Sequence, residues 1–138
     1  MRRFPLAAAS LCALAACATA TAVLLNPDVK LPPICPDGVV MFTAFDKIGV
    51  DYQEIALVEG SMIVDQGGGN ATLYAAERKK AASLGANGLI VGSIREPTET
   101  ERIAGVLYGE TRERLSSATA IYIPSDTQRV REACASKK

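Results

Sequence analysis

The middle of the chain restricts the fold most, because two strand-forming runs flank a helix-forming segment. Residues 52–63 alternate between apolar and polar side chains well enough to predict a strand. A glycine-rich break follows, and Asn70 or Thr72 can cap a helix that ends near Leu84. Residues 89–94 are then apolar on both faces, as expected of a buried central strand. The pattern predicts a strand-helix-strand unit whose crossover is right-handed if the two strands are parallel.

Shorter elements flank this unit. Residues 39–42 form an apolar run before it, and the polar, glycine-containing segment 95–109 predicts an exposed loop or hairpin. A last strand is predicted over 117–123, followed by a short helix over 127–135. We therefore expect an α+β fold with a small sheet of three to four strands, one main helix packed on one face and a short C-terminal helix.

The main helix is predicted to have an apolar stripe and a solvent-exposed face. Leu73 and Ala81 are among the residues of the stripe. Residues 77–80 are charged and predict a face exposed to solvent. Glu77 lies at the border of the stripe, where it can pair with a neighbouring base.

The N-terminus has the order of parts found in an export signal. Arg2 and Arg3 precede an uncharged apolar run over 6–16, which is shorter than the roughly 20 residues of a membrane-spanning helix. The run ends in Leu14-Ala15-Ala16-Cys17, which resembles the lipobox of bacterial lipoproteins. In that family the Cys thiol receives a diacylglyceryl group and a peptidase cuts just before it. The resemblance implies a 1–16 signal peptide and lipidation of Cys17.

An ordinary secretory signal is the alternative, because Ala18-Thr19-Ala20 also fits cleavage before Thr21. Both alternatives export the protein. Residues 17–36 contain several prolines and few helix formers after Leu25, and they predict an extended tether behind the lipidated Cys17. Residues 37–138 are then a single α+β domain.

Cysteine usage supports the same compartment. Cys12 is lost with the signal and Cys17 is used by the lipid, which leaves Cys35 and Cys134. Two cysteines in an oxidising compartment predict a disulfide. The alternatives are two free thiols, or half of a zinc site that lacks His and a C-x-x-C spacing.

Composition excludes several functions. The chain has no His, so it cannot form a Ser/His/Asp triad, a Cys/His pair or an ordinary catalytic zinc site. Its 15 basic and 15 acidic residues balance, and export leaves 13 basic residues against 15 acidic ones. This balance excludes electrostatic binding to nucleic acid or to anionic lipid. We predict no catalytic residue, no cofactor and no metal.

A second resemblance covers about 45 residues. The stretch around Tyr52-x-Glu54-Ile55-x-x-Val58, and above all the phrase Lys80-Ala81-Ala82-x-Leu84-Gly85-Ala86-Asn87, resembles small bacterial α+β domains. These domains include the envelope-stress sensor lipoprotein of the Rcs phosphorelay and cytoplasmic relatives named for heavy-metal binding. The resemblance implies the fold more than an activity. The stress sensor uses two disulfides, whereas this chain has one pair, and no ligand cluster matches the metal name.

One ligand site is a candidate from the sequence. Gly67, Gly68, Gly69 and Asn70 precede the main helix, where backbone N–H groups can hold a phosphate or carboxylate. The segment lacks the spacing of known phosphate-binding glycine motifs, so a plain turn is the alternative.

We therefore expect a non-enzymatic envelope lipoprotein. We expect a lipid to anchor it to a bacterial membrane, facing the periplasm. The outer membrane is the expected one. Its expected partner is another envelope protein, and its expected role is protein binding or stress sensing. The alternative function is a small-ligand or metal-binding periplasmic module, acting at the glycine-rich turn or through paired thiols.

Overall fold

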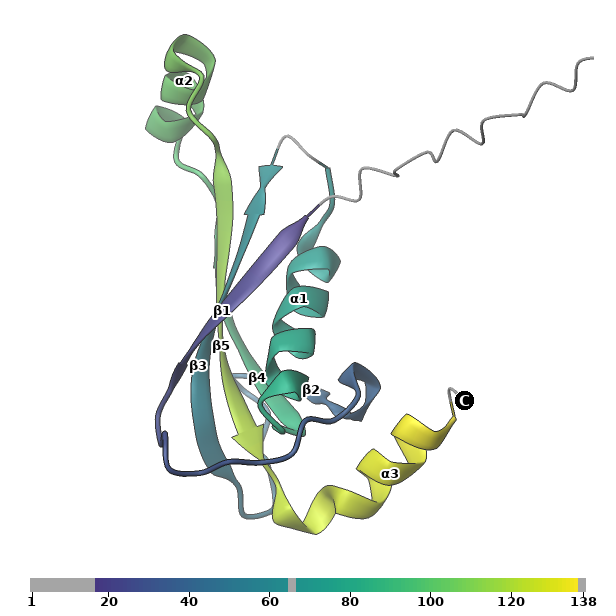
Figure 1. The fold of residues 1–138 in the computed structure, drawn as a ribbon. Coiled ribbons are helices and arrows are strands. Elements are labelled where there is room, and N and C mark those ends of the chain that lie inside the picture. The colour runs from purple at the N-terminus through teal and green to yellow at the C-terminus, as the bar shows by residue number, and fades with distance from the viewer. Residues whose placement is uncertain (1–16, 65–66, 137–138) are drawn as a thin grey trace, which may run out of the picture.

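The computed structural model describes residues 17–64 and 67–136, which form an α+β fold (Figure 1). The predicted signal peptide, 1–16, lies outside the described residues. The described residues contain a five-stranded mixed sheet in the order β1-β3-β5-β4-β2. The strands are β1 (Ala18–Leu24), β2 (Val40–Thr43), β3 (Gln53–Ile63), β4 (Gly88–Arg95) and β5 (Glu113–Tyr122). The α-helices are α1 (Asn70–Ser83), α2 (Glu99–Tyr108) and α3 (Thr127–Ala135), with short 3₁₀ turns η1 (Pro36–Gly38) and η3 (Pro124–Asp126).

The predicted strand-helix-strand unit is confirmed as β3, α1 and β4. Both strands pair antiparallel with β5, so β3 and β4 run parallel to each other with β5 between them. α1 begins and ends close to its predicted limits, and α3 covers the predicted residues. The α+β class is therefore confirmed, but the sheet has five strands rather than three to four.

The fifth strand comes from the predicted tether, which is a correction. Residues 18–24 form β1, which pairs antiparallel with β3 over its whole length. Its alanines are half-buried on the α1 side, while Thr19 and Thr21 are exposed. This period-2 alternation of small and β-branched residues is a strand signal that the prolines further along the segment outweighed.

The rest of the predicted tether also packs against the domain. The Ile34 N–H donates to the Ala82 carbonyl oxygen at the end of α1 (3.0 Å). Gly85 has φ +78, and a Cβ there would overlap Leu31 and lie 2.7 Å from the Pro32 carbonyl oxygen. Gly85 thus turns the chain out of α1 and also admits the 31–32 segment.

The segment 95–109, predicted as a loop or hairpin, contains α2. Thr98 and Glu101 form a capping box at its start, and Gly109 ends it with φ 70. A capping box and a left-handed glycine are start and stop signals for a helix. They lie in a polar stretch whose apolar residues come late, at Ile103 and beyond, so hydrophobic periodicity alone did not reveal the helix.

The core lies between α1 and one face of the sheet. Leu73, Ala81 and Ala82 of α1 are fully buried, as are Val58 and Ala120 of the sheet. Small side chains let the helix lie close to the strands. α3 instead contacts η1, and α2 projects beyond one end of the sheet (Figure 1). We call this end the α2 end, and the opposite one, near α3, the disulfide end.

Candidate functional site

A disulfide closes one end of the domain, as predicted. Cys35, before η1, is bonded to Cys134 in α3, with their Cα atoms 5.6 Å apart and a sequence separation of 99. Such a bond persists in oxidising compartments, so the domain belongs outside the cytoplasm. Both thiols that a metal site would need are used by the bond.

Polar contacts reinforce the disulfide end. Arg129 of α3 donates to the Gly38 carbonyl oxygen (2.9 Å) and pairs with Asp126. The buried Asn87 side chain accepts from the Ile123 N–H (2.7 Å) and donates to the Ile123 carbonyl oxygen (2.8 Å). Asn87 therefore ties the start of β4 to the end of β5, which explains its place in the phrase that follows α1.

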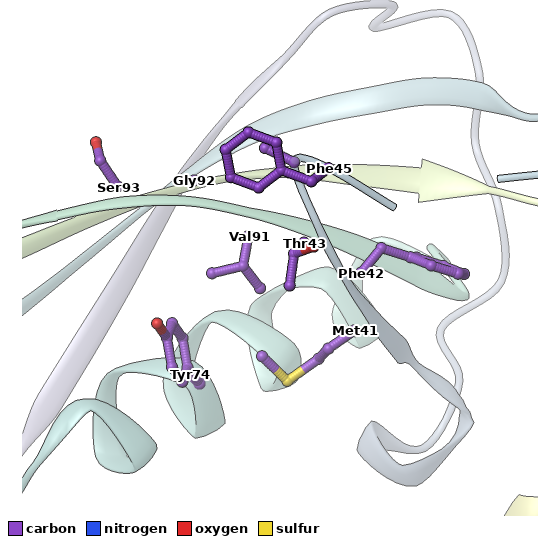
Figure 2. A pocket seen from close by; sticks show the side chains of 9 residues that line it. Met41, Phe42, Thr43, Phe45, Tyr74, Val91, Gly92 and Ser93 are labelled. Carbon is purple, nitrogen blue, oxygen red and sulfur yellow. The ribbon is translucent and has the colours of Figure 1, made fainter. Parts of the chain in front are cut away.

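An apolar groove of about 610 Å³ opens beside β2 and is the main candidate site (Figure 2). It is lined by side chains from three elements and the chain after β2, among them Met41, Phe42, Phe45, Tyr74 and Val91. None of its nine lining residues carries a formal charge. Figure 2 shows Met41 and Tyr74 on the α1 side of β4 and the Phe45 ring on the other side in this view.

The groove exists because β2 is short. β2 pairs with β4 only as far as Thr43 and Val91, whereas β4 continues to Arg95. The Thr43 N–H donates to Asp46 Oδ2 (2.6 Å), which closes a turn at the end of β2. This turn leaves the Phe45 side chain 96% exposed. The sequence showed apolar residues in this region. It did not show the register, which leaves the second half of β4 without a paired strand on the β2 side.

A buried carboxyl group, that of Glu77, lies between α1 and the sheet. This corrects the prediction of a solvent-exposed helix face at 77–80 for Glu77, whereas Lys79 is exposed as predicted. Glu77 is fully buried, and Ser116 Oγ donates to its Oε1 (2.7 Å). Gly60 makes room for this contact, because a Cβ there would lie 2.5 Å from Ser116 Oγ. Burial raises the pKa of Glu77, and hydrogen bonds from Ser116 and the Gly60 backbone oppose that rise in part. Glu77 is four residues from both Leu73 and Ala81, and this spacing places it on the buried face of the helix. The spacing is therefore the sequence signal that indicates the burial of Glu77.

The glycine-rich candidate forms an exposed turn before α1. Gly67, Gly68, Gly69 and Asn70 are all exposed, and Gly67 and Gly68 have positive φ. A Cβ added to Gly67 or Gly69 would have open space around it. Within residues 17–64 and 67–136, no three His, Cys, Asp or Glu side chains are grouped to hold a metal ion. Among the described residues, the turn thus leads into the N-terminus of α1 with all four of its residues exposed.

The predicted lipidation residue stands at the opposite end from the disulfide. Cys17 is exposed and directly precedes β1. Ala18 pairs with Met62, and Met62 with Arg114, so Cys17 lies at the α2 end of the sheet. No described helix is long and apolar enough to cross a membrane.

The fold and the disulfide define an extracytoplasmic α+β domain. Its fold is similar to that in a crystal structure of the Francisella virulence factor FvfA, with a TM-score of 0.52 and 15% sequence identity. The similarity covers 75% of this chain and 96% of FvfA, and at this identity it shows the fold alone. No family model matches the sequence, and no curated protein does.

Proposed function

We propose that this chain is a bacterial envelope lipoprotein, anchored through lipid on Cys17 to the outer membrane and facing the periplasm. Its domain is non-enzymatic and binds an apolar segment of another envelope protein, in a sensing or scaffolding role. The observation that carries the binding role is the uncharged groove beside β2. The lipobox before Cys17 and the disulfide between Cys35 and Cys134 support the anchor and the compartment.

The chemistry of the groove supports binding over catalysis. Acid–base or nucleophilic catalysis needs a titratable group within hydrogen-bond reach of the substrate. The polar side chains that line the groove are the hydroxyls of Thr43, Tyr74 and Ser93, and no charged side chain lines it to activate them. Its other side chains include the exposed ring of Phe45 and the thioether of Met41. Aromatic and Met side chains are enriched at protein interfaces because they bury much apolar area.

The lipid anchor is tested by the intact mass of protein expressed with its own leader and extracted from bacterial membranes. We expect a species that starts at Cys17, heavier by its acyl chains and lighter by the hydrogens lost on disulfide formation. A Cys17→Ser variant should lose the acyl mass and leave the membrane fraction, because no other residue of the lipobox offers a thiol. A soluble species that starts at Thr21 would contradict the anchor.

The binding role is tested at Phe45, whose side chain packs so little that its replacement leaves the fold intact. A photo-crosslinking residue at position 45 should capture a specific envelope protein in cells. The captured protein, once purified, should bind Phe45→Asp at least about tenfold more weakly than the unaltered domain, because a carboxylate would be desolvated in an apolar contact.

The matched control is Val50→Asp, which alters another exposed apolar side chain outside the groove. We expect its affinity for the captured protein to equal that of the unaltered domain. Equal weakening by both variants, or by neither, would refute the groove as the binding site.

A further inference from the structure

α2 has an exposed apolar stripe that no described part of the domain covers. None of its residues is buried. Ile103, Val106 and Leu107 are 59, 77 and 66% exposed, and their i, i+3, i+4 spacing places them on one face of the helix. Contiguous exposed apolar surface marks interaction sites in soluble domains. The stripe therefore indicates a surface that binds another molecule or a membrane.

The position of α2 identifies that partner. α2 precedes β5 in the chain, and the register places the start of β1 and the start of β5 on either side of the end of β3. Cys17 and α2, about 80 residues apart in the sequence, thus lie at the same end of the sheet. Figure 1 shows that α2 extends further beyond the sheet than the start of β1 does. A flat surface that contacts both α2 and the start of β1 is therefore tilted relative to the strand direction.

We propose that α2 lies in the lipid–water interface of the membrane that anchors Cys17. This inference rests on the proposed function, because the lipid on Cys17 is what brings α2 to the membrane. The apolar stripe enters the interface, and the two contacts fix how the domain is inclined above the bilayer. The disulfide end then faces away from the lipid.

The lipid anchor allows a helix as short as α2 to bind the membrane. An isolated ten-residue helix has little apolar area to hold it at a membrane. A helix on a domain already held by acyl chains binds intramolecularly, so its effective concentration at the surface is high. Glu99 begins the same face of α2, four residues before Ile103, which confines insertion to the second half of the helix.

The test uses tryptophan fluorescence, because the chain has no Trp and a single substitution gives a single probe. Leu107→Trp lies within the stripe. Tyr52→Trp is the matched control, since Tyr52 is also exposed but precedes β3 at the disulfide end. Full-length lipoprotein of each variant is reconstituted into phosphatidylcholine vesicles whose acyl chains carry bromine, a quencher that acts only at short range.

We expect several-fold stronger quenching of the Trp at 107 than of the Trp at 52, and emission from the Trp at 107 at a shorter wavelength than from the Trp at 52. A further change, Ile103→Glu, should abolish the quenching at 107, because a carboxylate in the stripe opposes insertion. Ile103 is exposed, so the fold should tolerate this change.

The outcomes separate this inference from the proposed function. If the intact mass shows acyl chains but the Trp at 107 is not quenched, the membrane contact of α2 is overturned and the anchor stands. A blue shift at 107 that depends on protein concentration, without quenching, would assign the stripe to a second copy of the chain. If no acyl chains are present, the anchor and this inference fall together.

Discussion

Replacing Cys35 and Cys134 together by Ala should lower the free energy of unfolding by about 2 to 5 kcal/mol. The bond closes a loop of 99 residues, and a long loop gives the unfolded chain much conformational freedom when the bond is lost. The bond also holds α3, in which Val130 is the buried residue. Urea denaturation of the oxidised protein and of the double variant measures the difference.

Two comparisons make this result specific. The unaltered protein treated with a reductant should match the double variant, because both lack the same covalent link. Hydrogen exchange in the double variant should rise first in the α3 amides, since little apolar burial holds that helix in place. A loss of stability below about 1 kcal/mol would mean that Arg129 and Asn87 hold the disulfide end without the bond.

The stability of the Glu77→Gln variant relative to the unaltered protein should be higher at pH 8 than at pH 4, because only the carboxyl group ionises over this range. Burial raises the pKa of Glu77 from the ordinary value of 4.5, so the folded state holds this proton more tightly than the unfolded state. The contribution of Glu77 to stability is therefore fully present below pH 4.5, the ordinary pKa of this group. It declines as the pH rises through the raised pKa.

Denaturation curves between pH 4 and 8 measure this dependence. Glu101→Gln is the control with the opposite sign, because hydrogen bonds at Thr98 and Arg95 lower the pKa of Glu101. Its contribution to stability is present above the ordinary pKa and fades as the pH falls. If Glu77→Gln leaves the slope with pH unchanged, Glu77 is ionised at no cost and its raised pKa is refuted.

Much of the fold could be predicted because its signals are local. The β3-α1-β4 unit follows from strand alternation, a glycine break and a helix end, and each depends on residues close in sequence. The disulfide followed from cysteine count and compartment. β1 and α2 also have local signals, the alanine–threonine alternation and the capping box of Thr98 and Glu101, which the surrounding composition outweighed.

The candidate site could not be predicted in the same way. The groove depends on where β2 stops beside β4, which is a property of long-range register. The burial of Glu77 depends on Ser116, 39 residues away, and on the missing side chain of Gly60. The placement of Cys17 and α2 at the same end of the sheet depends on the direction and register of its strands. Sequence periodicity reports which face of an element is apolar, but not which element lies against it.

The direct passage from Cys17 into β1 gives the proposed anchored protein a mechanical property. A partner that pulls the domain away from the membrane loads the chain at Cys17 and draws β1 lengthwise along β3. The hydrogen bonds between antiparallel strands lie across that direction, so the seven residue pairs from Ala18 to Leu24 bear the load together in shear. They do not open one after another, as they would if the strand were peeled. In the proposed lipoprotein, the edge strand β1 thus transmits force between the lipid anchor and the domain.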